Sequence, residues 1–121
     1  MENNSSELQG HFNRNESMWK IWQEYITDPE AEFTVNFVFY SSKKKNMELL
    51  CNQLKSDSID FKVRETKMLF FLRGWEITAD IKKKWTLVEL QGKTGNLFIM
   101  SKQTGVSLEG CGALMPKRTN V

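Results

Sequence analysis

The sequence is poor in the residue types that enzymes most often use for catalysis and metal binding. It contains one histidine and two cysteines among 121 residues. His11 lies in a polar stretch, and Cys51 and Cys111 are far apart with no CxxC pattern. A zinc site or a histidine-based triad needs several such residues brought together. We therefore expect no metal, no cofactor, no catalytic residue and no enzymatic activity, and two reduced, buried cysteines.

Long apolar stretches are also missing. A helix that crosses a bilayer needs about 20 consecutive apolar residues, whereas the longest apolar run, Met68 to Leu72, has five. The first residues are polar and lack the basic and apolar regions of a secretory signal. The sequence therefore predicts a cytoplasmic protein with no membrane partner.

Aromatic residues are plentiful, with eight Phe and four Trp, and the length suits a single domain. Charge is uneven along this domain. Residues 1–32 carry seven acidic and two basic residues, a net charge of −5, whereas residues 33–121 carry eight and fifteen, a net charge of +7. Three interpretations stay open: ordinary solvated charge, an acidic arm that folds against the basic body, or a basic face that meets an anionic partner.

The N-terminal part divides into two predicted segments. Residues 1–16 are polar and show no periodicity, so we expect a flexible tail. Residues 17–27 carry apolar side chains at helical spacing and predict a short helix that ends before Asp28–Pro29. Residues 28–121 then form the main domain.

The main domain begins with a strand followed by a helix. Residues 33–40 alternate between a strongly apolar face and a mixed face, which predicts a strand. A helix follows, with Ser41 or Ser42 as its cap and an apolar stripe of Met47, Leu50, Cys51 and Leu54.

A hairpin comes next. Residues 59–64 alternate between apolar and charged residues, which is typical of an edge strand. Residues 65–67 form the predicted turn, and residues 68–81 form a long strand with a bulge at Gly74.

Two interpretations remain for the segment that starts at Thr86. A helix would place Leu87, Leu90, Thr94, Leu97 and Ser101 on one stripe, although Gly92 and Gly95 would each cost about 1 kcal/mol. The alternative is a hairpin that turns at residues 92–95. Gly105 is a helix stop, and residues 106–115 form the last strand.

The order βαββαβ predicts an α+β, ferredoxin-like sandwich. We expect a four-stranded antiparallel sheet around a central parallel pair, two helices on one face, and the N-terminal helix across an end or edge. The expected core comprises Val35, Phe37, Leu50, Leu54, Phe61, Phe71 and Leu108.

Nucleic-acid binding is the alternative function. An open ferredoxin-like sheet face can stack bases on aromatic side chains, but the RNP1 pattern is absent, and the glycines at 92–95 lack phosphate-loop spacing. Two lysine runs, Lys43–Lys45 and Lys82–Lys84, remain as possible contacts of an RNA- or anion-binding module.

Two local patterns carry a family resemblance. The first is Asp28–Pro29–Glu30–Ala31 with Phe33–Thr34–Val35, and the second is the run from Val106 to Gly112. Over residues 28–116 the chain resembles the RraB family, the regulators of ribonuclease E activity of the B type. Cys111 stands where the family pattern favours Trp.

The resemblance implies a ferredoxin-like α/β sandwich and favours the helix for the doubtful segment. It also implies a non-enzymatic regulator that acts on a ribonuclease or RNA-processing component through protein contact. The predicted partner-binding residues form two groups: Glu109, Gly110, Cys111 and Gly112 in the last strand, and Lys82, Lys83 and Lys84.

Overall fold

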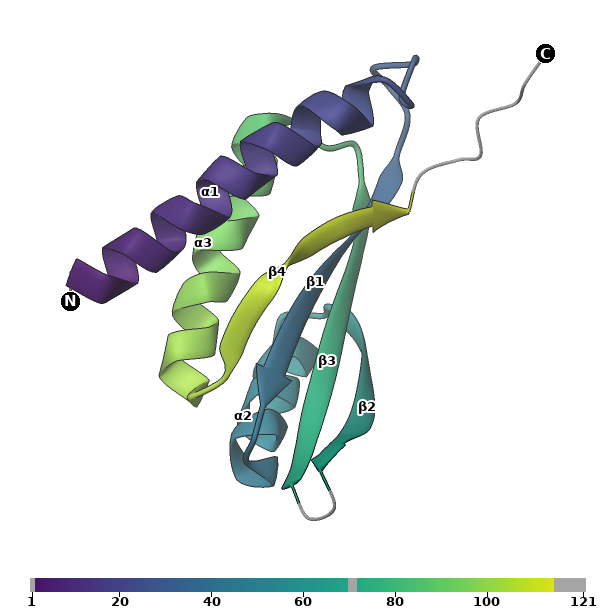
Figure 1. Ribbon diagram of the computed structural model, residues 1–121. Coiled ribbons are helices and arrows are strands. Elements are labelled where there is room, and N and C mark those ends of the chain that lie inside the picture. Colours follow the sequence, from purple (N-terminus) through teal and green to yellow (C-terminus); the bar gives the residue numbers. More distant parts are fainter. Residues whose placement is uncertain (1, 70–71, 115–121) are drawn as a thin grey trace.

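The computed structural model describes residues 2–69 and 72–114, which form three helices and one four-stranded sheet (Figure 1). The elements are α1 (Glu2–Gln23), β1 (Phe33–Ser41), α2 (Lys44–Ser56), β2 (Asp60–Leu69), β3 (Leu72–Lys83), α3 (Leu87–Thr104) and β4 (Ser107–Leu114). The predicted α+β class is confirmed.

The sheet has the order β2-β3-β1-β4, and all three neighbouring pairs are antiparallel. This arrangement is consistent with a ferredoxin-like fold. The expected central parallel pair is wrong, because β1 and β3 run in opposite directions. The crossover through α2 returns β2 in the direction of β1, and the following hairpin reverses the chain before β3.

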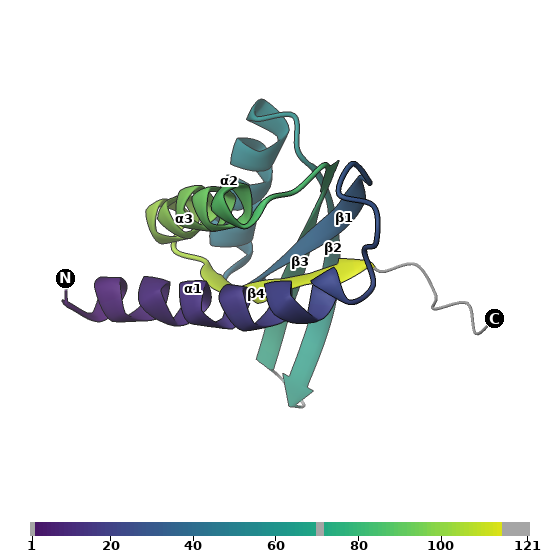
Figure 2. The same cartoon turned by 90° about the horizontal axis from the view of Figure 1, so that it is seen from above.

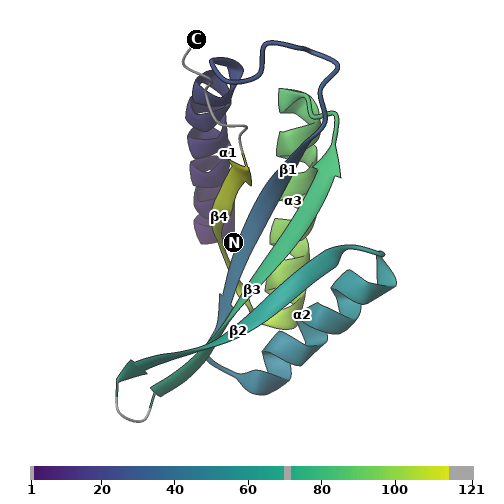
Figure 3. The same cartoon turned by 90° about the vertical axis from the view of Figure 1, so that its right-hand side faces the viewer.

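The alternation in β1 is confirmed. Phe33, Val35, Phe37 and Phe39 are buried, and the residues between them are only half-buried. The buried set faces α2 and α3, which lie on one face of the sheet (Figures 2 and 3). Of the other expected core residues, Leu50, Leu54 and Leu108 are buried and Phe61 is partly buried. Phe71 lies outside the described residues.

Residues 87–104 form a helix, so the hairpin alternative is wrong. The Thr86 side chain caps this helix by accepting a hydrogen bond from the backbone N–H of Glu89. The helix ends at Gly105, whose φ of 74° is the left-handed conformation that favours glycine. The predicted stripe is buried at Leu90, Thr94, Leu97 and Ser101, which offsets the cost of the two interior glycines.

The prediction of a flexible tail over residues 1–16 is wrong for residues 2–16, which belong to α1. The helix continues to Gln23, so the predicted boundary between tail and helix at Ser17 falls inside one continuous helix. A stripe at helical spacing packs against α3 and β4, and two of its members are buried polar residues, His11 and Asn15. An apolar periodicity search passes over such a stripe because its polar members interrupt the apolar pattern.

The hairpin of β2 and β3 extends beyond the rest of the sheet. β1 ends opposite Trp75, whereas β2 and β3 remain paired to Leu69 and Leu72 (Figures 1 and 3). Residues 65–67 are therefore strand rather than turn. No bulge occurs at Gly74, which pairs with Thr66 in regular register and lies under the Tyr40 ring.

α1 lies alongside β4, next to α3, and both α1 and β4 run in the same direction in Figure 1. The Trp19 and Trp22 rings pack on Phe33 at the C-terminal end of this helix. Among residues 2–69 and 72–114, no helix has the length and apolar content needed to cross a bilayer.

Candidate functional site

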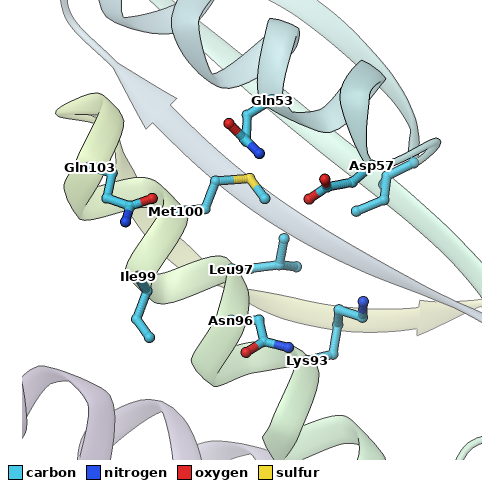
Figure 4. Close-up of a pocket in the computed structure, with 9 residues that line it drawn as sticks. Gln53, Asp57, Lys93, Asn96, Leu97, Ile99, Met100 and Gln103 are labelled. Carbon is cyan, nitrogen blue, oxygen red and sulfur yellow. The ribbon is translucent and has the colours of Figure 1, made fainter.

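A groove of about 250 Å³ lies between α2 and α3 on the outer side of the helix layer (Figure 4). Gln53 and Asp57 line it from the C-terminal end of α2, and Lys93, Asn96 and Gln103 line it from α3. The groove exists because α2 and α3 cover neighbouring parts of one sheet face and diverge above it.

The floor of the groove is apolar. Leu97 and Met100 form it, with exposed fractions of 1% and 8%, and half-buried Ile59 contributes from the segment after α2. Ile99 stands at the rim with 54% of its side chain exposed. The groove therefore exposes a small apolar surface at its floor and rim.

The polar lining has no internal partners. Gln53, Asn96 and Gln103 carry carboxamides, and none of these three side chains makes a hydrogen bond within the described part of the chain. Asp57 and Lys93 face the same groove from opposite helices without forming an ion pair. Each of these groups is therefore free to bind a ligand.

The lining combines polar, charged and aliphatic side chains. It holds one acid and one base, three amides and aliphatic side chains, and neither histidine nor cysteine. Across residues 2–69 and 72–114, no group of three His, Cys, Asp or Glu side chains is placed to hold a metal ion. The groove offers hydrogen bonds, a small apolar contact and a balanced charge.

The predicted residues of β4 lie away from this groove, on the edge strand of the sheet beside α1. Glu109 is exposed at an irregularity in the pairing of β1 with β4. It lines a separate hollow with His11 and Arg14 of α1. Gly110 and Gly112 follow Glu109 along β4. They pair with Val38 and Asn36 of β1, respectively.

Cys111 points into the contact between α1 and β4. Its thiol donates a hydrogen bond to Asn15 Oδ1 at 3.2 Å. Burial raises the pKa of Cys111 to about 11, so the thiol is protonated at neutral pH. Its side chain joins two elements of the fold and has the properties of a structural residue rather than a nucleophile.

The predicted lysines are at the end of β3, and two of them are paired. Lys83 forms an ion pair with Glu89, and Lys84 forms one with Glu30. Lys82 is exposed and pairs in register with Thr34 of β1. The structure therefore does not bring this group together with Glu109–Gly112, because β1 lies between β3 and β4.

The Lys43–Lys45 run differs from the Lys82–Lys84 run because its lysines form no ion pairs among the described residues. Lys43, Lys44 and Lys45 begin α2, are exposed, and make no ion pair with any described residue. The first turn of α2 has no acidic residue, and Lys43 provides no side-chain cap, so the predicted cap at Ser41 or Ser42 is wrong. Ser41 instead exchanges hydrogen bonds with the backbone of Lys43.

The acidic N-terminal part does fold against the basic body. Glu7 pairs with Lys102 of α3 at 2.9 Å, and the Glu30–Lys84 pair is a second link. For these two acidic residues, the interpretation that the arm folds against the body is confirmed.

No protein-family model matches the sequence, and no curated protein matches it. The resemblance to the RraB family therefore stays a prediction that rests on its two local patterns.

Proposed function

We propose that the protein is a non-enzymatic binding protein of ferredoxin-like, RraB-like type that modulates a ribonuclease or RNA turnover through protein contact. We place that contact at the α2–α3 groove. The observation that supports this choice is the set of five unpartnered polar side chains above the Leu97–Met100 floor. Unpartnered polar groups around an apolar centre match the polar rim and apolar core of protein interfaces.

The chemistry of the rare residues supports binding over catalysis. Burial lowers the pKa of His11 and raises the pKa of Cys111, so both are neutral near pH 7. Nη2 of Arg14 lies 3.0 Å from Nδ1 of His11, and no hydrogen bond from a Ser, Thr or Cys side chain to the His11 ring occurs among the described residues. These side chains stabilise the contact of α1 with β4.

Affinity capture from an extract of the native host tests the proposal. The wild-type chain should enrich a ribonuclease or another RNA-processing component. Asn96→Arg places a long charged side chain in the groove and should abolish that enrichment. The matched control is Asn52→Arg, on an exposed position of α2 that does not line the groove.

Two results would overturn the proposal. One is that no RNA-processing component is enriched by the wild-type chain. The other is that Asn96→Arg captures the same component as the wild type and the control.

A second candidate function is binding of RNA or another polyanion, and the unpaired Lys43–Lys45 run favours it. Lysines at a helix N-terminus oppose the helix dipole, and an anion placed there would relieve this repulsion. The binding would weaken steeply as salt rises.

A gel-shift titration with single-stranded RNA at low and high salt tests this candidate. Lys44→Glu with Lys45→Glu should remove binding, whereas Lys83→Glu should change it less, because Lys83 is already paired with Glu89. Binding that ignores both salt and charge reversal at Lys44 and Lys45 would rule it out.

A further inference from the structure

We infer that the α2–α3 groove takes a short, extended, uncharged segment of the partner protein and holds it through the main-chain amides of that segment. This inference rests on the proposed function, because it describes the part of the partner that enters the same groove. It adds the conformation, the length and the chemistry of that part.

The carboxamides of the lining match the peptide group. A carboxamide has donor N–H groups and an acceptor oxygen, and each residue of an extended chain offers one N–H and one C=O. Gln53 faces the groove from α2, while Asn96 and Gln103 face it from α3 (Figure 4). A chain lying between the helices can therefore be hydrogen-bonded from both sides.

The conformation follows from which backbone groups are available. A helical segment uses its interior N–H and C=O groups in its own hydrogen bonds, so it would leave the three carboxamides unpaired. An extended segment has these groups exposed on both edges. The lining therefore favours an extended segment over a helix.

The length follows from the spacing along α3. Lys93 and Gln103 mark the two ends of the lining on this helix, ten residues apart. At about 1.5 Å per residue this separation is about 15 Å. An extended chain rises about 3.3 Å per residue, so about four or five residues cover the groove.

The floor selects one kind of side chain. Leu97 and Met100 offer an aliphatic and a thioether surface, and the flexible Met side chain adapts to different shapes. An aliphatic residue in the middle of the segment would cover this floor. It would also contact Ile99 at the rim, which is otherwise more than half exposed.

The charges of the lining balance. Asp57 contributes one negative charge and Lys93 one positive charge, with no other ionisable side chain in the groove. A strongly charged segment gains nothing from such a lining, and a phosphate backbone would meet a single cation beside an anion. Binding should therefore depend little on salt, in contrast to binding of a polyanion.

A phage library that displays linear twelve-residue peptides, panned on the intact protein, tests the inference. Phage that also bind Asn96→Arg are removed at each round. The remaining peptides should share an uncharged stretch of four or five residues with a central aliphatic residue. Their binding is then measured by fluorescence anisotropy at 50 and 500 mM NaCl.

Carboxamide removal is the decisive comparison. The double variant Gln53→Ala with Gln103→Ala should weaken a selected peptide at least tenfold, because it removes amide contacts from both sides of the groove. Ala is the strongest helix former, so these substitutions leave α2 and α3 intact. Asn52→Ala, outside the groove, should change the affinity less than twofold.

Three results would overturn the inference: no groove-dependent peptide is recovered, the recovered peptides are dominated by charged residues, or the double variant binds them like the wild type. The two proposals fail separately. Capture of a ribonuclease that is blocked by Asn96→Arg but insensitive to the double variant keeps the proposed function and removes the inference. Peptide binding as expected, without capture of an RNA-processing component, keeps the inference about the groove and removes the proposed function.

Discussion

Asn15 on α1 donates a hydrogen bond of 2.9 Å from Nδ2 to Oγ1 of Thr94 on α3, and both side chains are almost completely buried. The same Nδ2 lies 3.0 Å from Gln91 Oε1, and Oδ1 accepts from the Cys111 thiol. One side chain thus joins α1 to α3 and to β4. This bonding explains why a helix with two buried polar residues docks in one defined position.

Replacing Asn15 with Ala should destabilise the protein by about 1–3 kcal/mol, because it removes the partner of the buried Thr94 hydroxyl and of the partly buried Cys111 thiol. The free energy of unfolding from urea titration measures this effect. Asn13→Ala is the matched control, since Asn13 is exposed and its side chain accepts a hydrogen bond from Gln9 of the same helix. Equal stability of the two variants would show that the buried contact does not position α1.

His11 makes stability depend on pH. Its pKa in the folded protein lies below the ordinary value of 6.5, chiefly because of burial and then because of the positive charge of Arg14. The charge of Lys102 also lowers this pKa. The charge of Glu7 and a backbone hydrogen bond with Leu108 raise it. Below pH 6.5 the unfolded chain binds the proton more readily than the folded one, so stability falls as pH falls from 6.5 towards the folded pKa.

We therefore expect the free energy of unfolding to be lower at pH 5.5 than at pH 7.5. His11→Gln removes the titrating group and keeps a polar side chain, so it should flatten this difference. Urea titrations of both proteins at the two pH values measure it. An unchanged difference in the variant would assign the pH dependence to other groups.

Two glycines next to or within α3 should respond in opposite ways to the same substitution. Gly105→Ala should cost about 1 kcal/mol or more, because φ is 74° and the new Cβ would lie 2.7 Å from Asn46 Nδ2. Gly92→Ala should stabilise by about 0.5–1 kcal/mol, since nothing lies within 4 Å and Ala favours the helix. Thermal unfolding of both variants checks the signs, and equal signs would contradict the assigned end of α3.

Phe37 carries the packing between the sheet and the helices. It is fully buried and lies 6.2 Å from Trp85 between ring centroids. Phe37→Ala should cost about 3–5 kcal/mol. Val38→Ala, on the opposite face of the same strand, should lower the free energy of unfolding much less. Chemical denaturation measures both losses, and a larger loss for Val38→Ala would mean that the assigned buried face of β1 is wrong.

Both cysteines should react slowly in the folded protein. Burial raises the pKa of Cys51 and of Cys111, and the thiolate is the reactive form. Iodoacetamide labelling at pH 8, followed by mass spectrometry, should be slow in buffer and fast in urea. Rapid labelling of Cys111 in the native protein would contradict its assignment as a structural residue.

The first strand and α2 were predictable because their apolar residues follow one period each, whereas the period alone left the segment of α3 open between a helix and a hairpin. β1 alternates without interruption, and the stripe Met47, Leu50, Cys51 and Leu54 is fully buried. The N-terminal half of α1 was not predictable in the same way. His11 and Asn15 occupy its buried stripe, and their burial depends on partners some eighty or more residues away.

The groove was missed for a different physical reason. Gln53, Asn96 and Gln103 are ordinary polar residues on helix surfaces, and their sequence positions carry no motif. Only the packing of α2 beside α3 brings them together. Conversely, Glu109–Gly112 and Lys82–Lys84 stood out in the sequence, yet they lie on separate strands and on different parts of the surface.

The docking of α1 on β4 sets an order for folding during synthesis. Asn15 leaves the ribosome 96 residues before its partner Cys111, a delay of about 5–20 s at about 5–20 residues per second. Trp19 and Trp22 instead pack on Phe33 of β1, which follows them closely in the sequence. The contact of Asn15 with β4 can therefore form only after the last described strand has been made, whereas the C-terminal end of α1 can meet β1 earlier.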